Sequence, residues 1–453
     1  MAWPVVIRVA SYTAMTFVDV VMVSRVGKAE VAAIVPAALT FFTIYVFIEG
    51  FASLNNTFVS QNFGAGRFRE CARYTWQTIY VVVALSVLVQ AAHLAAPGLF
   101  ALMGHAPEVQ ARELIYFQTR LYGAVFVGLM VTLSGFYQGI SRPRVAMVVG
   151  VIANAANVGI NYVLIFGKLG LPAMGIRGAA LGTVIASLLQ LAILVALFLS
   201  RTTNATFGTR STLRPDLGRL GQCFRVGGPA GLHWMLDVGT WAIFVTVIVG
   251  RFGTDQLSAS NIAGQFIRLS WLPTVGLNIA ATQLMGQWIG RGRIDIAKRR
   301  AYTALKLGMG YMTSMGIVFL VFRYRLVSLF RPEPAVVAVA ARIMIVAAVF
   351  QIFDAIGIVL YGALKGAGDT LAPAIMMIGS AWLVFLPSAV LLSRHLGLEA
   401  PGAWIGAAIH LALIAGLMYW RFRSERWRRI DLGPPASLTP EPAIHPVQPE
   451  AGA

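Results

Sequence analysis

The 453-residue sequence has few charged residues: Asp, Glu, Lys and Arg make up 12% of it, whereas soluble globular proteins average about 25%. Acidic residues are the scarcer kind, with 18 Asp and Glu against 36 Lys and Arg. Apolar residues make up 58% of the chain. This composition excludes an ordinary soluble domain and predicts a polytopic membrane protein.

Cysteine is almost absent. Cys71 and Cys223 both fall in connections that we expect on the cytoplasmic side, so neither a disulfide nor a metal site is expected from them. The sequence also shows no cleavable signal peptide, because the apolar residues begin at Ala2 without a basic segment and run into Asp19 without a small-residue cleavage site. The first membrane helix is therefore expected to begin at once.

The net charge of +18 is a feature that nucleic-acid-binding proteins share. Here the Lys and Arg residues cluster in short segments between apolar runs rather than along one solvated face, so we expect no nucleic-acid partner. Alternate connections are rich in Arg, which predicts N- and C-termini in the cytoplasm by the positive-inside rule. We expect a multi-pass protein of the bacterial inner membrane, acting as a monomer in the lipid bilayer.

Apolar runs of about 20 residues, separated by polar or Gly/Pro segments, number twelve. The predicted class is an all-α polytopic membrane protein with twelve transmembrane helices. The predicted spans lie near residues 3–24, 32–56, 75–97, 114–139, 145–166, 177–200, 226–250, 258–288, 302–322, 335–364, 372–393 and 401–421.

An internal repeat divides these spans into six and six. Residues 60–67 (S-Q-N-F-G-A-G-R) match residues 286–293 (G-Q-W-I-G-R-G-R). An even number of spans per repeat makes the halves parallel, so the two lobes are expected to be related by a pseudo-two-fold axis along the membrane normal. The predicted parts are an N-terminal six-helix lobe (1–200), a cytoplasmic linker (201–225), a C-terminal six-helix lobe (226–422) and a disordered cytoplasmic tail (423–453) rich in Pro and Glu.

One apolar run contains an ionisable carboxylate near its middle. From Ala335 to Leu364 the charged residues are Arg342 and Asp354. A charged side chain at the centre of a membrane helix costs roughly 2.5–3.5 kcal/mol on insertion scales, so such a residue usually faces a polar cavity and has a function. The sequence therefore predicts a functional site at Asp354, followed by a tight turn at Lys365-Gly-Ala-Gly-Asp-Thr370.

These residues resemble the tenth helix of the multidrug and toxic compound extrusion (MATE) family, whose NorM-like members have an F-D-A-like element and an R-G-x-x-D-like turn. The resemblance extends from Pro4 to about Arg421, and its order and spacing in two halves make chance improbable. Other matching pieces are F-V-D-V-V-M-V-S-R-V-G (17–27), the turn at 64–67, Y-Q-G-I-S-R-P-R (137–144), N-V-G-I-N-Y-V-L-I-F-G (157–167), G-I-R-G-A-A-L-G-T (175–183) and V-G-L-N-I-A-A-T-Q-L-M-G-Q (275–287).

For the N-terminal lobe, the resemblance implies a cation- or proton-coupling site at Asp19, Asn157 and Asn161. Asn154 and the two other amides lie on one helix face, at i, i+3 and i+7. The alternative for these amides is interhelical hydrogen bonding, worth about 0.6 kcal/mol per contact in membranes. Thr183 could add an oxygen, with helix packing as its alternative.

For the C-terminal lobe, the resemblance implies coupling by Asp354 and by Asp237, which stands where NorM-like proteins usually have Glu. The same pair is the candidate Na⁺ site and, with Trp234 and Phe350, the candidate substrate site. Phe350 stands where these proteins often have Tyr, so a hydroxyl partner for Asp354 is missing. The alternative for the carboxylates is a buried ion pair with an Arg such as Arg268.

Two neighbours of Asp237 have open interpretations. His233, one helical turn earlier, either shares a proton with Asp237 or is a core histidine with satisfied hydrogen bonds. Trp234 either lines a drug cavity or packs in the core.

The expected function is export of small amphipathic organic cations in exchange for H⁺ or Na⁺, with no other cofactor. The alternative is a lipid-linked precursor flippase of the same superfamily, for which a cationic central cavity is expected. An enzyme is not expected, because a membrane prenyl transferase would need paired D-D-x-x-D-like clusters and the sequence has none.

Overall fold

Helices form the regular structure of the chain. The computed structural model describes residues 2–433, and the regular elements within that range are all helical, so the predicted all-α class is confirmed. The N-terminal lobe contains α1 (Ala2–Ser24), α2 (Lys28–Ala52), α3 (Asn55–Gly64), α4 (Phe68–Val89), α5 (Ala92–Leu102), α6 (Pro107–Tyr122), α7 (Ala124–Gly139), α8 (Pro143–Phe166) and α9 (Gly175–Phe198). After the short α10 (Arg201–Phe207), the C-terminal lobe contains α11 (Leu217–Ile243), η1 (Phe244–Ile248), η2 (Val249–Phe252), α12 (Thr254–Gly290), α13 (Ile294–Ser328), α14 (Pro334–Gly366), α15 (Leu371–Ser380), η3 (Ala381–Phe385), α16 (Leu386–Val390), η4 (Leu391–His395), α17 (Glu399–Arg423) and η5 (Arg426–Arg429).

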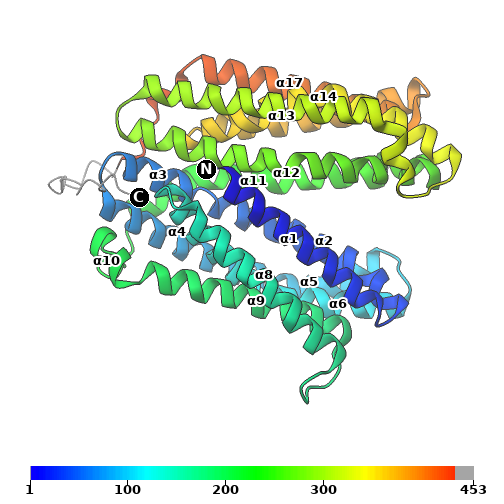
Figure 1. The fold of residues 1–453 in the computed structure, drawn as a ribbon, viewed down its shortest axis with the longest axis horizontal. Helices are drawn as coiled ribbons and strands as arrows, with labels where there is room; N and C mark the ends of the chain where they lie inside the picture. The colour runs from blue at the N-terminus through cyan, green and yellow to red at the C-terminus, as the bar shows by residue number, and fades with distance from the viewer. Residues whose placement is uncertain (1, 434–453) are drawn as a thin grey trace.

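The two lobes lie side by side. Figure 1 shows α12, α13, α14 and α17 in one layer and α1, α2, α5, α6, α8 and α9 in the other. The arrangement matches the twelve-helix, two-lobe fold that the repeat predicts.

The predicted spans all coincide with helices. Within residues 2–433, ten helical stretches are long and apolar enough to cross a membrane, and the pair α6 and α7, bent by 46°, is an eleventh. The remaining predicted span, 258–288, coincides with the 37-residue helix α12. Its many amide side chains, such as Asn278, Gln283 and Gln287, lower its hydropathy.

Several helices run past the apolar runs that predicted them. Helix α13 extends over Ile294–Ser328 rather than 302–322, because its polar flanks are rich in good helix formers. Helix α11 begins at Leu217, inside the predicted linker of 201–225. The Asp216 side chain accepts a hydrogen bond from the Arg219 backbone N–H at 2.8 Å and so caps this earlier start.

The chain also remains ordered past residue 423, where disorder was predicted. Trp427 is 1% exposed and donates its indole N–H to the carbonyl oxygen of Phe422 at 2.8 Å. Leu432 is 4% exposed and packs in an apolar cluster formed by the N-terminal lobe and α11. These two side chains give the segment apolar surface to bury, so the prediction was wrong as far as Gly433. The predicted tail over 434–453 lies outside the described residues.

The repeat forms the junction between the lobes. Gln61 Nε2 donates to the carbonyl oxygen of Gly366 at 2.9 Å, and its repeat partner Gln287 donates to the carbonyl oxygen of Gly139 at 2.6 Å. This reciprocal exchange is what a two-fold relation between two parts requires. We call this end of the molecule the closed end and define it by residues 57–67, 139–142, 283–293 and 364–369.

Glycine allows the backbones to approach closely there. A Cβ at Gly64 would collide with the carbonyl oxygen of Gln287, and a Cβ at Gly290 would collide with that of Gln61. The two contacts are equivalent in the repeat. The matching glycines therefore mark a tight contact between the lobes as well as a turn.

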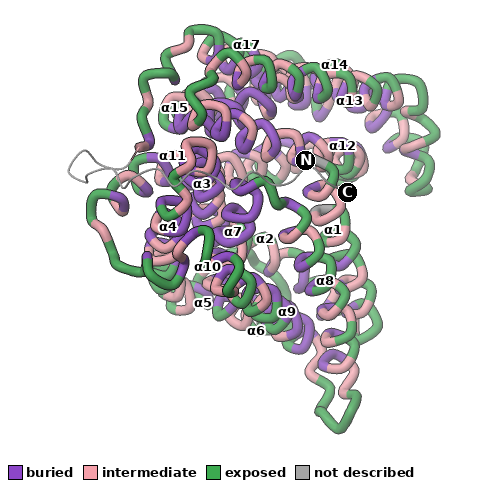
Figure 2. Tube along the Cα trace, turned by 60° about the vertical axis from the view of Figure 1, so that its left-hand side comes forward, coloured by how far each residue is buried: buried purple, intermediate pink, exposed green. Residues whose placement is uncertain are grey.

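Burial is high at the closed end despite its polar sequence. Figure 2, in which the left-hand side of Figure 1 is turned forward, shows α3 and α7 largely buried, and residues 55–62 of α3 are all buried. Asn55 donates through Nδ2 to the carbonyl oxygen of Thr132 at 2.8 Å. Such hydrogen bonds satisfy polar groups that would otherwise be costly to bury.

Candidate functional site

The N-terminal candidate residues meet between α1 and α8. Asn161 Nδ2 donates to Asp19 Oδ1 at 2.7 Å and to Asn157 Oδ1 at 3.1 Å. Asp19 is 8% exposed, and both amides are fully buried. The structure therefore brings together the three residues that the sequence predicted as one site.

This site has spare hydrogen-bonding capacity. Asn157 Nδ2 and Asn161 Oδ1 are buried without a hydrogen-bond partner. A Cβ at Gly182 of α9 would collide with Asn161 Oδ1, so that glycine makes room for the amide. An unpartnered donor and an unpartnered acceptor beside a carboxylate can bind a small polar ligand or water.

The neighbouring candidates have structural contacts. Asn154 Nδ2 donates to Ser11 Oγ at 2.6 Å and so joins α8 to α1. Thr183 Oγ1 donates to the carbonyl oxygen of Ala179, one turn earlier on its own helix, at 2.9 Å. Both residues therefore have the packing role that the sequence left open.

The sequence analysis missed two charged residues of this lobe. Glu49 on α2 lies in electrostatic contact with Arg8 and Tyr45, and Arg120 on α6 lies near Asp19 and over the ring of Phe41, 4.7 Å from its centroid. A signal for Glu49 was present, because it is the only charged residue between positions 31 and 66. The sequence gave no comparable indication that Arg120 approaches Asp19.

Asp237 on α11 and Asp354 on α14 lie close enough for their charges to interact. Both are partly exposed, and neither belongs to an ion pair formed within residues 2–433. Arg268, the alternative partner, is exposed on α12. Neither carboxylate is therefore neutralised by an ion-paired cation from the residues that the structure describes.

The aromatic candidates separate into two groups. Phe350 is 1% exposed and stacks on Trp404 with ring centroids 6.3 Å apart, so in this structure it packs in the core, and the substrate contact stays a prediction. It lies one turn before Asp354, but close packing of α14 against α17 covers its ring. Trp234 is partly exposed and meets Trp271 of α12 at a centroid distance of 6.5 Å, so it keeps an accessible face.

His233 is buried at 5% exposure, and neither of its ring nitrogens has a hydrogen-bond partner. It is therefore not the satisfied core histidine that was one of the two interpretations. Its ring lies 5.3 Å from that of Tyr361 on α14, measured between centroids. His410 of the same lobe differs, because its Nδ1 lies 2.8 Å from the hydroxyl oxygen of Ser380.

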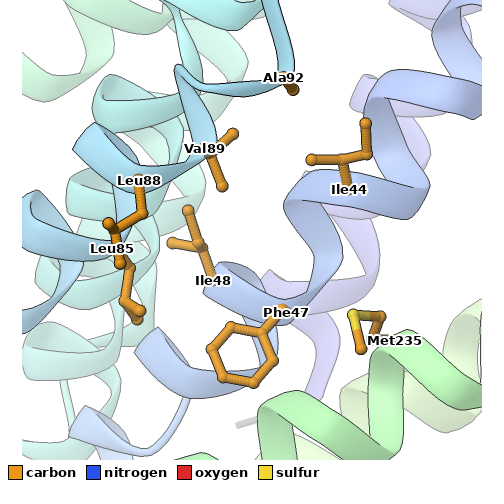
Figure 3. A pocket seen from close by; sticks show the side chains of 8 residues that line it. All are labelled: Ile44, Phe47, Ile48, Leu85, Leu88, Val89, Ala92 and Met235. Carbon is orange, nitrogen blue, oxygen red and sulfur yellow. The ribbon is translucent and has the colours of Figure 1, made fainter. Parts of the chain in front are cut away.

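An apolar pocket lies where α2, α4 and α5 meet α11 (Figure 3). Its volume is about 330 Å³. It contains no carboxylate, but Met235 on its wall is two residues from Asp237, and the remaining wall comes from the N-terminal lobe. The lining residues are Ile44, Phe47, Ile48, Leu85, Leu88, Val89, Ala92 and Met235.

No three His, Cys, Asp or Glu side chains gather into a metal-binding group in the part of the chain that the structure describes. Cys71 and Cys223 are both buried free thiols. A cation at Asp237 and Asp354 would therefore have two protein carboxylates and would need further oxygen ligands from water or from its surroundings.

Two helical lobes joined at one end, each with a carboxylate among its membrane helices, define a two-lobe membrane transporter. The sequence profile described as MatE matches residues 4–163 and 234–391. The chain belongs to the MatE family, whose members are transporters rather than enzymes.

Its relatives include the protein named "Probable multidrug resistance protein NorM" of Mesorhizobium japonicum, 30% identical over 97% of this chain and 94% of the relative. The protein of the same name from Rhizobium meliloti is 30% identical over 96% and 97%. Among solved structures, a MOP superfamily transporter from Pyrococcus furiosus superposes with a TM-score of 0.85 at 19% identity, over 95% of this chain and 96% of that one. The eukaryotic MATE transporter AtDTX14 gives 0.82 at 18% identity, over 94% and 95%. At these identities the structures support the fold alone.

Proposed function

We propose that this protein exports amphipathic organic cations across the membrane in exchange for H⁺ or Na⁺. The observation that carries the proposal is that Asp237 and Asp354, which lie within electrostatic range, are in no ion pair formed by the described residues. Two negative charges in a low-dielectric site repel each other and favour the uptake of a positive charge. The relatives named for multidrug resistance agree with an organic cargo.

Exchange follows from competition at these carboxylates. A ligand shifts the two states of a transporter only by its differential affinity for them. A carboxylate pair can hold a coupling ion or the positive end of the cargo, but not both well, so one displaces the other. The driving force is adequate, since the membrane potential supplies about 2.3 kcal/mol per charge per 100 mV.

Alternating access would proceed by separation of the lobes at the closed end. The bonds of Gln61 and Gln287 to backbone carbonyl oxygens are reciprocal, and Thr57 and Ser141 make further side-chain bonds across the same junction, so a rocking motion would break them together. The apolar pocket of Figure 3 takes its walls from both lobes. It can accept the apolar part of a cargo whose charge lies near Asp237, and it would change shape as the lobes move.

The proposed orientation places the closed end and both termini in the cytoplasm of a bacterial inner membrane. The support is the Arg-rich composition of the connections at that end. Single cysteines placed at Arg210 and Arg299 should react only with membrane-permeant reagents in intact cells. Labelling of either position from outside would overturn the orientation.

The proposal is tested by dye efflux from proteoliposomes, with the Na⁺ and proton gradients imposed separately. Asp354→Asn keeps the side-chain volume and removes the charge, so coupled efflux should fall to the level of protein-free liposomes. The matched control is Asp295→Asn, at an exposed residue paired with Arg293, which should keep wild-type efflux. Efflux under neither gradient by the wild-type protein would refute the export function. Wild-type ion dependence in Asp354→Asn would move the coupling role to Asp237 or to the N-terminal site.

The N-terminal site is proposed as a second coupling group. Asp19→Asn and Asn157→Ala should impair transport while insertion and expression stay near normal, because these polar groups cost insertion energy and do not form the apolar core. Expression that falls in step with activity would instead assign them to helix packing.

A further inference from the structure

A cluster of three buried hydrogen-bond donors lies between α11 and α14, outside the carboxylate pair. It consists of His233, Tyr361 and Lys365, which are 5%, 4% and 6% exposed. The rings of His233 and Tyr361 are 5.3 Å apart, and Lys365 Nζ lies 5.9 Å from the centroid of the Tyr361 ring. We call this group the donor cluster.

The polar atoms of His233 and Tyr361 in the donor cluster lack hydrogen-bond partners among the described residues. Both ring nitrogens of His233 and the hydroxyl of Tyr361 are buried without a hydrogen-bond partner, and Lys365 enters none of the ion pairs within residues 2–433. Lys298 of the same lobe differs, because it pairs with Glu425. Buried polar atoms without partners are costly, and Lys365 adds an ammonium that is in no ion pair beside them, so their presence together points to a ligand that supplies an acceptor.

The cluster is aligned with the carboxylates. Asp354, Tyr361 and Lys365 are at i, i+7 and i+11 on α14, which places them on one helix face with rises of about 10 and 16 Å. On α11, His233 precedes Asp237 by one turn, and Tyr361 lies in electrostatic contact with Asp237. Negative groups therefore lie toward the middle of the bundle and positive or donor groups toward the closed end.

Opening of the closed end would expose the cluster. Thr57 Oγ1 donates to the backbone carbonyl oxygen of Lys365 at 3.0 Å, and Gln61 donates to that of the next residue, Gly366. Both donors belong to the N-terminal lobe. When the lobes separate there, these bonds break and the region around the Lys365 ammonium becomes accessible from that side.

We propose that the donor cluster binds the anionic group of a zwitterionic cargo, a carboxylate or a similar monoanion, while the cationic end lies at Asp237 and Asp354. This inference rests on the export function proposed above. The Lys365 ammonium and the neutral side chains of His233 and Tyr361 can all donate hydrogen bonds to the two oxygens of a carboxylate. The rise is about 6 Å from His233 to Asp237 on α11 and about 10 Å from Asp354 to Tyr361 on α14, so the spacing favours a cargo whose charges are about 6–10 Å apart. A small inorganic anion offers the cluster the same acceptor chemistry, and the experiment below distinguishes it from the anionic group of the cargo.

The test uses two probes that differ in one group: an amphipathic cationic dye with a carboxylate on a spacer of about 10 Å, and its methyl ester. The full-length protein is reconstituted in proteoliposomes, and efflux of each dye is measured at equal concentration. Lys365→Met removes the charge with little loss of volume, and Tyr361→Phe removes only a hydroxyl. Lys306→Met, at an exposed lysine of α13, is the matched control.

The wild-type protein should export both dyes. In Lys365→Met and Tyr361→Phe the ratio of acid to ester efflux should fall about tenfold, the loss expected for a bond to a charged group, whereas Lys306→Met should keep the wild-type ratio. An unchanged ratio in Tyr361→Phe and Lys365→Met would overturn the inference. A loss of ester efflux that depends on chloride in the buffer would assign the cluster to an inorganic anion and also overturn it. Export of the ester alone by the wild-type protein refutes this inference but leaves the export function intact, and export of neither dye refutes the export function itself.

Discussion

Alanine at Gly290 should shift the protein away from the state in which the closed end is closed. A Cβ there would overlap the carbonyl oxygen of Gln61, which is backbone and cannot swing aside. Overpacking of a tight contact costs about 1–3 kcal/mol, which corresponds to a shift of about 5- to 150-fold in a two-state equilibrium. Gly64 meets the backbone of Gln287 in the same way. Gly64→Ala and Gly290→Ala should therefore have effects of similar size.

Hydrogen exchange followed by mass spectrometry measures this shift. In both variants the amides of segments 61–67 and 287–293 should exchange faster than in the wild-type protein, while the rest of the helices keep their protection. Gly310→Ala is the control, because nothing lies within 4 Å of a Cβ at that position of α13. The gain in helix propensity from Gly to Ala opposes the effect, so it cannot produce a false positive.

Two outcomes would refute this reasoning. Exchange in Gly290→Ala equal to that in Gly310→Ala would mean that the closed end does not separate as a unit. A large effect at Gly290 with none at Gly64 would contradict the two-fold relation between the contacts. Faster exchange throughout the molecule would indicate global destabilisation, and a thermal unfolding scan of the same samples separates that case.

Two further predictions concern other contacts. Gly182→Ala should lower the unfolding free energy by about 1–3 kcal/mol, because the new Cβ collides with Asn161 Oδ1, whereas Gly159→Ala, with open space around it, should not; equal melting temperatures by tryptophan fluorescence would contradict this. Near the end of the described residues, the hydrogen bond that Lys298 donates holds the pKa of Glu425 below its ordinary value of about 4.3. Since the carboxyl has a lower pKa in the folded state than in the unfolded state, the contact is fully effective at neutral pH and is lost as the pH falls below that ordinary value. Corrected exchange rates of amides 425–433 should rise in acid, and already at neutral pH in Glu425→Gln; rates independent of pH and of the substitution would exclude the ion pair as the anchor of this segment.

The helices, their number and the two-fold repeat could be predicted from the sequence. A membrane requires every spanning backbone to satisfy its own hydrogen bonds, so a long apolar run allows one structure, the helix. The repeat at residues 60–67 and 286–293 could be recognised in the sequence. The structure shows the role of both copies, since each copy forms a hydrogen bond to the other lobe. Helix ends were less predictable: capping by Asp216 and burial of Leu432 depend on local contacts that apolar runs do not indicate.

The residues of the N-terminal site were predicted from the family resemblance, and Asp19, Asn157 and Asn161 also stand out as polar groups in otherwise apolar helices. Only the tertiary structure shows that these side chains form hydrogen bonds to one another. Glu49 had the same signal in the sequence and was overlooked.

Tertiary structure alone decided which side chains share a space. Helix α14 is apolar on every side, so its sequence does not indicate which face points to lipid, to the core or to the other lobe. Phe350 and Asp354 are one turn apart, yet packing against α17 covers the first and leaves the second accessible. The donor cluster of His233, Tyr361 and Lys365 joins two helices more than a hundred residues apart, and only the rotation of α11 and α14 about their axes brings those three side chains together.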